Sequence, residues 1–238
     1  MRGIETFDVE DVRECGDVIR KLGDGVETME AAAQRVVAYL YDELRDETGA
    51  RACPLVRLYK THPFGRLPSD LQAFATGVAR EAPPPDVRCL TLLGTAGDVP
   101  AWNDRHQSTG HQAIPLPSEQ VVEQLPMILQ LITQLGLDVT TVVRPDPGDV
   151  RELAQKTYEV FHVPDAMSSP YVPAKDFVEA HAIASALGFG GMLYTGDFYA
   201  VVMFARVPIS ADAAQMLKIL ALPVRVPLLA HLRRVFAD

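Results

Sequence analysis

The chain has 238 residues, of which 48% are hydrophobic and 22% are charged, a composition that fits one large or two small globular domains with a sizeable core. Its net charge of -9 disfavours nucleic acid and anionic lipid as partners, because an acidic surface repels both. The apolar runs fall short of the roughly 20 residues that cross a bilayer and the first residues lack the pattern of a secretory signal, so we expect a cytoplasmic protein with no membrane partner.

Two amphipathic helices are predicted near the N-terminus. Asp8 is the candidate N-cap of the first helix and Thr28 that of the second, longer one. Each helix carries one apolar stripe that must be buried against another element. We therefore divide the chain into an N-terminal helical extension, residues 1–27, and a single domain over residues 28–238.

Two strands are expected next, over residues 54–61 and 87–95, separated by a helix over residues 69–80. A long inserted segment then covers about residues 96–173. Its first part, residues 96–117, holds the single tryptophan and many turn-forming residues, and irregular segments of this length are often functional or disordered.

Within the insertion, Ser118 is a candidate cap for a helical stretch. Pro126 either kinks that helix or begins a second one, because proline lacks the backbone donor. Gly136 is expected to end it, a further helix is predicted over residues 150–160, and residues 162–173 form a second irregular connection.

The C-terminal part contains the most regular pattern. Strands are predicted over residues 186–194 and 198–205, joined by a tight turn in which Gly196 supplies a positive φ. Ser210 then caps a helix, in which two prolines predict a bend or restart between Leu222 and Leu228.

The strand over residues 198–205 is apolar on both of its alternating faces. A tight turn makes its pairing antiparallel, and antiparallel sheets usually keep one face wet. We infer that this strand is central, with the first two helices and the last helix on one face and the insertion on the other. A loop roof over an apolar sheet is where a small molecule could bind.

This order of elements resembles the GAF domain, a relative of PAS domains, and the resemblance is sharpest at GFGGMLYTGDFYAVVMFARVPISADAAQMLKILALPVRVPLL. PLVRLYKTHPFGRLPSDLQAFA and CLTLLGTAGDVPAWNDRHQSTGHQAIPLPS are similar to the earlier strands and pocket loop of such domains. The resemblance implies a GAF-like α/β (α+β) fold and a bacterial sensory input domain of the kind found ahead of histidine kinases and cyclases. It implies a non-enzymatic role in ligand sensing.

The chemistries known in that family can be compared with this sequence. Bilin-binding GAF domains commonly have a cysteine followed by histidine, whereas Cys53 precedes proline and Cys89 precedes leucine. The NKFDE motif associated with cyclic-nucleotide binding does not occur in the sequence. The free methionine sulfoxide reductases use several cysteines in one pocket; this chain has three, with Cys15 ahead of the expected domain, so a redox enzyme stays open as an alternative. A ligand-free protein interaction module is the second alternative.

Candidate ligand-binding residues cluster in the first part of the insertion, where a stacking surface, an amide, a guanidinium and two imidazoles occur together. The candidates are Trp102, Asn103, Arg105, His106, His111 and, at the end of the first strand, Tyr59. The alternative is a structural role, in which Trp102 packs against the sheet and the polar side chains form hydrogen bonds with the backbone of the loop. Lys60 and His62, with Arg57 beside them, are expected at the pocket rim, although exposed strand-end polarity explains them equally well.

No metal site is predicted, because the histidines lack the spacing of zinc ligands, and the cofactor is unknown. No catalytic residue is assigned, because hydrolase, zinc protease, nucleotide-triphosphatase and dinucleotide motifs do not occur. We expect a homodimer that packs through its terminal helices, an unidentified small-molecule ligand, and a separate signalling partner or a place in a longer system.

Overall fold

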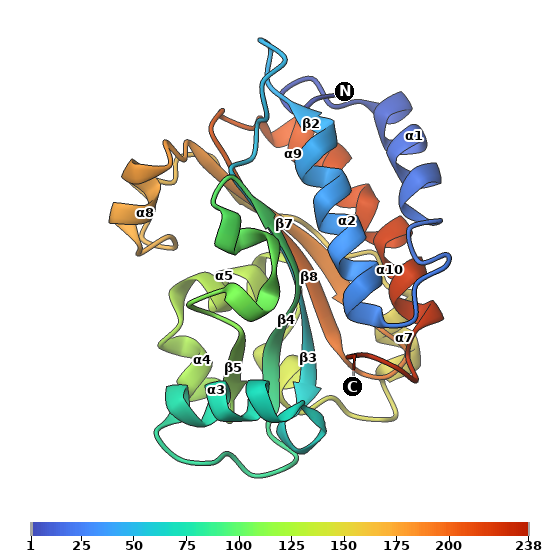
Figure 1. The fold of residues 1–238 in the computed structure, drawn as a ribbon, viewed down its shortest axis with the longest axis vertical. Coiled ribbons are helices and arrows are strands. Elements are labelled where there is room, and N and C mark those ends of the chain that lie inside the picture. The colour runs from blue at the N-terminus through green and yellow to red at the C-terminus, as the bar shows by residue number, and fades with distance from the viewer. Residues whose placement is uncertain (1, 238) are drawn as a thin grey trace.

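The computed structural model describes residues 2–237, and a six-stranded antiparallel sheet forms the middle of this part of the chain (Figure 1). The strand order is β5-β4-β3-β8-β7-β6, so β3 and β8 are the two central strands. A short parallel pair, β1 (Arg2–Gly3) and β2 (Leu44–Arg45), lies apart from the sheet. The strands of the sheet are β3 (Leu55–Pro63), β4 (Arg88–Gly97), β5 (Ala113–Leu116), β6 (Phe161–Val163), β7 (Ser185–Met192) and β8 (Phe198–Ala205).

The helices come partly from the two ends of the described chain and partly from its middle. The first and last helices in the chain are α1 (Val9–Ile19), α2 (Met29–Glu43), α9 (Ala211–Leu217) and α10 (Ala221–Ala230). The helices between them are α3 (Ser69–Ala79), α4 (Glu119–Glu123), α5 (Pro126–Gln134), α6 (Val139–Val143), α7 (Val150–Gln155) and α8 (Lys175–Ala180).

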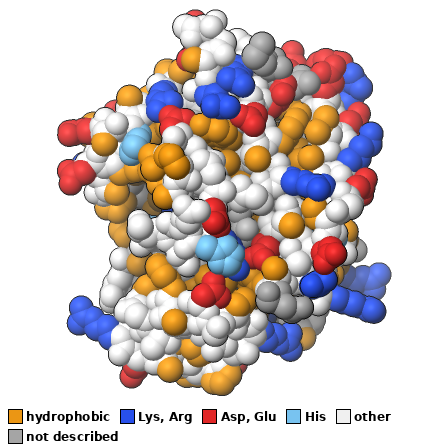
Figure 2. All heavy atoms as spheres, in the orientation of Figure 1, with side chains coloured by type: hydrophobic (Ala, Val, Ile, Leu, Met, Phe, Trp, Pro, Cys, Tyr) orange, Lys and Arg blue, Asp and Glu red, His pale blue; other side chains and the backbone are white. Residues whose placement is uncertain are grey.

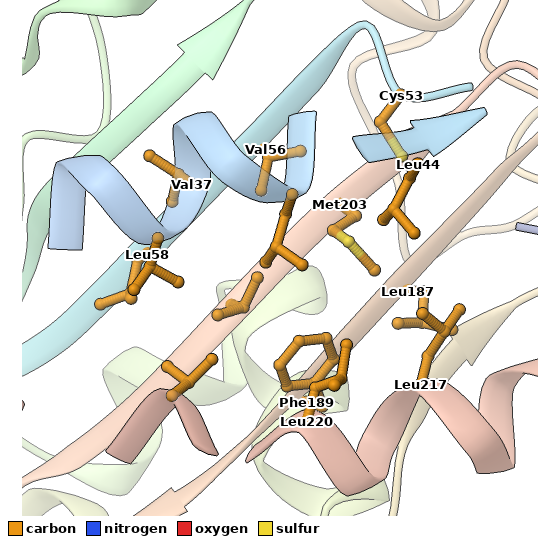
Figure 3. Packing of buried hydrophobic residues seen from close by; sticks show 14 of the residues in the cluster. Val37, Leu44, Cys53, Val56, Leu58, Leu187, Phe189, Met203, Leu217 and Leu220 are labelled. Carbon is orange, nitrogen blue, oxygen red and sulfur yellow. The ribbon is translucent and has the colours of Figure 1, made fainter. Parts of the chain in front are cut away.

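One face of the sheet packs against α1, α2, α9 and α10, and together they form one continuous hydrophobic cluster. Figure 3 shows Val37 of α2 beside Leu58 of β3, and Leu217 and Leu220 below Leu187 and Phe189 of β7. Because α1 contributes to this cluster, the N-terminal extension shares its core with the rest of the domain.

The opposite face packs against α4, α5, α6 and α8 and their connections, in a second hydrophobic cluster. All eight residues of β8 are buried, with Tyr199 exposed by only 2% and Val201 by 0%. Tyr199 belongs to the cluster under the terminal helices and Val202 to the cluster under the insertion. The predictions of a central two-sided strand and a GAF-like α+β fold are confirmed.

Most of the local predictions are also confirmed. The side chains of Asp8, Thr28, Ser118 and Ser210 each accept a hydrogen bond from backbone N–H groups in the first turn of a helix. Gly196 has φ +76° in the turn between β7 and β8, where a residue with a Cβ would be strained.

The inserted segment is more regular than predicted. Pro126 begins a separate helix, and the segment supplies both edge strands of the sheet, β5 and β6. The helix predicted over residues 150–160 ends at Gln155, and the chain then runs extended towards β6. The Tyr158 hydroxyl donates to the carbonyl of Leu153 in the last turn of this helix at 2.6 Å.

The bend or restart predicted between Leu222 and Leu228 is not a restart, because α10 is continuous there. The helical stretch is interrupted earlier, by a 3-10 turn at Lys218–Leu220, and α10 then continues through both prolines. Pro223 lies in the first turn of α10, where a backbone donor would have no helical acceptor, so it costs little there.

Residues 211–230 have the length and mean hydropathy, 1.4, of a membrane span, contrary to our expectation that no such stretch exists. Leu217, Leu220, Val224 and Leu228 from this stretch are nevertheless fully buried in the hydrophobic cluster beneath the terminal helices. Packing against the sheet therefore accounts for its apolar character.

Candidate functional site

A cavity of about 380 Å³ lies between the sheet and the inserted segment; we call it the apolar cavity. Strands β3, β4, β5 and β8 form its floor, and α5, α8 and Trp102 form its roof and walls. A hollow on the left edge of Figure 2 lies between the regions of α8 and α5, and hydrophobic side chains surround it. Its lining is Leu55, Arg57, Tyr59, Leu90, Trp102, His111, Ile114, Leu125, Pro126, Met127, Ile128, Leu131, Val172, Pro173, Ala174, Phe177, Val202 and Phe204.

The alternation of β3 brings Arg57 and Tyr59 to the floor of this cavity, since side chains two residues apart share a face of a strand. The guanidinium of Arg57 donates from Nη1 to the Tyr59 hydroxyl at 3.2 Å and from Nη2 to Ser108 Oγ at 3.4 Å. Its Nε is buried and has no hydrogen-bond partner among the described residues. The apolar cavity thus holds a guanidinium whose hydrogen-bond partners among the described residues are neutral.

His111 lies beside this guanidinium and has φ +61°, an uncommon backbone conformation for a residue other than glycine. Burial lowers the pKa of its imidazole, and the positive charge of Arg57 lowers it further. His111 is therefore neutral near pH 7, and Arg57 carries the positive charge of this wall.

Aromatic rings close the other end of the cavity. Trp102 lies edge-on to His181, with ring centroids 4.6 Å apart, and to Phe177 of α8, at 5.8 Å. Phe177 in turn meets Phe204 of β8 at 5.1 Å. These contacts join the roof to the floor of the cavity and offer flat surfaces to a bound molecule.

Three of the six candidate residues, Tyr59, Trp102 and His111, line the apolar cavity. Asn103 is engaged in its own loop, where its side-chain amide bonds the N–H and C=O groups of Gly97 at 3.1 and 2.8 Å. Asn103 therefore has the structural role that we gave as the alternative, in which a polar side chain of the insertion forms hydrogen bonds with the loop backbone.

Arg105 and His106 lie away from the apolar cavity. The Arg105 guanidinium is 6% exposed and donates to Glu30 at 2.6 Å and to Asp70 at 3.2 Å, so it joins α2 to α3. The exposed ring of His106 lies 3.6 Å from the same Asp70 carboxylate.

A second cavity, of about 760 Å³, lies on the opposite face of the sheet, where β3 ends and β8 begins; we call it the basic cavity. Lys60, His62 and Asp197 lie at its wall, and residues 232–237 pass along its side. Lys60 and His62 therefore do not share the apolar cavity with Arg57, contrary to our expectation of one rim. They occupy alternate positions on β3 and point to the other face.

A buried ion cluster forms the wall of the basic cavity. Asp197 accepts from Lys60 Nζ at 2.6 Å, from the Thr195 hydroxyl at 2.6 Å and from the guanidinium of Arg88. Burial lowers the pKa of Lys60 to about 8, against the opposing effect of Asp197. Although burial alone would raise the pKa of Asp197, Lys60, Thr195 and Arg88 hold it below its ordinary value.

The three cysteines are buried, free, and outside the lining of both cavities. Burial raises the pKa of Cys53 and that of Cys89 to about 12, so both are protonated thiols near neutral pH. Within residues 2–237 no three His, Cys, Asp or Glu side chains converge in a way that could hold a metal ion.

The sheet order, its two covered faces and the roofed cavity together form a GAF-like α+β fold. No protein-family model and no curated protein matches the sequence. Solved structures to which the chain is similar include the reduced form of fRMsr of Staphylococcus aureus, with 11% identity, a TM-score of 0.43, and coverage of 92% of this chain and 95% of that one.

Two further similar structures come from phytochromes. The chromophore-binding domain of bacteriophytochrome RpBphP3 from R. palustris is 9% identical, with a TM-score of 0.43 over 94% of this chain and 62% of that one. A phycoerythrobilin-bound GAF domain from a cyanobacterial phytochrome is 14% identical, with a TM-score of 0.38 over 93% and 96%.

Proposed function

We propose that the protein is a non-enzymatic sensory domain that binds a small amphipathic anion in the apolar cavity. The observation that carries this proposal is Arg57, a guanidinium in the lining of the cavity whose hydrogen-bond partners, Tyr59 and Ser108, are neutral. A carboxylate or sulfonate would pair with Arg57, and its apolar body would cover the hydrophobic floor and meet the ring of Trp102.

The proposal predicts stoichiometric binding of 8-anilinonaphthalene-1-sulfonate, a fluorescent anion with an apolar ring system. Ile128→Trp places a larger side chain in the cavity and should abolish binding. Arg57→Gln keeps a polar side chain but removes the charge, and should weaken binding about tenfold, the value of one charge-assisted hydrogen bond. Fluorescence titration of the folded protein measures both effects.

Arg151→Gln is the matched control for the loss of charge, because Arg151 is exposed on α7 outside both cavities. Near-ultraviolet circular dichroism separates binding by the native protein from binding by a loosened core. If the folded wild type fails to bind the fluorophore, and native mass spectrometry of the purified protein shows no retained small molecule, the ligand-free interaction module becomes the better interpretation.

The redox-enzyme alternative receives no support from the positions of the cysteines. A thiol-based reduction needs a thiolate within reach of the substrate, whereas Cys53 and Cys89 are buried outside both cavities and their pKa values are raised. A Cys53→Ser and Cys89→Ser double variant that lost a thiol-dependent sulfoxide reductase activity of the wild type would reverse this judgement.

We also propose that the protein acts as a cytoplasmic homodimer that signals to a separate partner through its terminal helices. Leu222 and Val226 are 47% and 43% exposed and lie four residues apart, hence on one face of α10. Val18, 40% exposed, lies on α1, which packs against α10.

The dimer proposal can be tested separately from ligand binding. The double variant Leu222→Glu and Val226→Glu should be a monomer in sedimentation velocity, because the new carboxylates of the two protomers would repel each other across the interface. Val78→Glu, at an exposed valine on α3, is the control and should leave the dimer intact. A monomeric wild type would remove this part of the proposal without touching ligand binding.

A further inference from the structure

The basic cavity lies at the end of the helix-covered face of the sheet, where α2 begins and α10 has ended. Its inner wall is formed by Lys60, Arg88 and Asp197, and its outer side by residues 232–237. The backbone N–H groups of Met29 and Glu30 donate to the carbonyls of Arg234 and Val235 at 2.9 Å each, so the chain segment beside the cavity is bonded to the start of α2.

The charge of the cavity lining opposes that of the whole protein. Among the described residues that line it, Asp197 is the single acid, whereas the bases are Lys60, Arg66, Arg88, Arg233 and Arg234. The chain as a whole carries a net charge of -9. Figure 2 shows blue side chains, with red ones among them, on the side where Figure 1 marks the C-terminus.

The acidic side chains available here balance only part of this positive charge. Asp197 is shared between Lys60 and Arg88, so one carboxylate faces two cations. Glu27 pairs with Arg234 at 2.8 Å. Arg66 and Arg233 are exposed and form no ion pair among the described residues, which leaves an excess of positive charge around the cavity.

We propose that the basic cavity binds a phosphorylated small molecule, whose phosphate is held by Arg66 and Arg233 from the mouth and by Arg88 from the inner wall. Guanidinium groups match phosphate oxygens in geometry and charge, and the volume of about 760 Å³ is in the range of small-molecule sites. His62 and Phe236, with ring centroids 5.2 Å apart, provide aromatic surface beside the phosphate.

This site is independent of the proposed function, because the two cavities lie on opposite faces of the sheet and share no lining residue. Failure of one proposal therefore leaves the other standing. Binding of the naphthalene sulfonate, which reports on the apolar cavity, should persist in variants of the basic cavity.

Isothermal titration calorimetry of the full chain with inorganic pyrophosphate tests the proposal. The wild type should bind one equivalent, more weakly as salt is added. Arg66→Ser combined with Arg233→Ser should weaken binding at least about tenfold, since two charge-assisted contacts are lost. Both arginines are exposed, so the fold should survive.

Arg144→Ser combined with Arg151→Ser is the matched control, because it removes the same charge from exposed positions outside the cavity and should leave the affinity within about twofold. Equal weakening by both double variants would overturn the proposal in favour of diffuse charge attraction, and so would a wild type that gives no binding. Succinate, a dicarboxylate, should bind more weakly than pyrophosphate; equal affinity would overturn the assignment to phosphate.

Discussion

Replacing Asp197 by asparagine is expected to lower the free energy of unfolding by about 3 kcal/mol or more at neutral pH, because the change leaves Lys60 and Arg88 without their shared carboxylate. The Lys60 side chain is only 2% exposed, so water cannot replace the lost partner. Urea denaturation of the wild type and the variant measures the difference.

Asp98→Asn provides the comparison for this effect. Asp98 also accepts two side-chain hydrogen bonds, from Tyr41 at 2.6 Å and Arg206 at 2.5 Å, but it lies at a partly exposed site where an ion pair contributes about 1 kcal/mol or less. If Asp197→Asn cost no more than Asp98→Asn, the cluster would not stabilise the end of the sheet in the way that its burial indicates.

The same residue gives the stability an acid dependence of known sign. Because the folded-state pKa of Asp197 lies below its ordinary value of 3.8, its contribution is fully present above 3.8 and is lost as the pH falls through the folded-state pKa. The difference in stability between wild type and Asp197→Asn should therefore shrink in acid.

The second large effect is expected at Gly94, where the backbone of α2 lies directly on β4. A Cβ at this position would lie 2.8 Å from the carbonyl carbon and oxygen of Ala33 and from the amide nitrogen of Gln34. Gly94→Ala must push α2 away from the sheet and should cost about 1 to 3 kcal/mol, the range measured for overpacked cores. Thermal and urea denaturation would both show the loss.

Gly77→Ala is the matched control, with the same chemical change and the opposite expected sign. Gly77 is exposed within α3, and a Cβ there meets nothing within 4 Å. The substitution should raise the stability by about 0.5 to 1 kcal/mol, since alanine favours the helix over glycine. A destabilising Gly77→Ala, or a neutral Gly94→Ala, would contradict the packing described for α2.

The parts of the fold that could be predicted from the sequence are those fixed by local patterns. The two apolar faces of β8 predict that the strand is buried on both sides. Asp8 and Thr28 predict the starts of their helices, because a capping side chain bonds backbone N–H groups within its own turn. Strands β5 and β6 could not be recognised, because they have only four and three residues and are defined by their pairing with β4 and β7.

The candidate site was predictable to a smaller extent. The position of the cavity followed from the apolar faces of the sheet, but composition alone could not separate Trp102, which lines it, from Arg105, which pairs with Glu30 across 75 residues of sequence. The alternation of β3 was a usable signal that we did not apply: it separates Arg57 and Tyr59 from Lys60 and His62. The pairing of Lys60 with Asp197 spans 137 residues and required the folded chain.

The two hydrophobic clusters on either side of the sheet have no residue in common. A molecule that enters from the insertion side therefore meets the hydrophobic cluster that lies opposite the terminal helices. Its presence can reach those helices through strands β3 and β8, since a strand carries both sets of side chains on one main chain, and through contacts such as that of Arg105 with Glu30 of α2. The sheet is thus the layer shared by both clusters, and any route from the cavity to the terminal helices that runs through it depends on how rigidly β3 and β8 are paired.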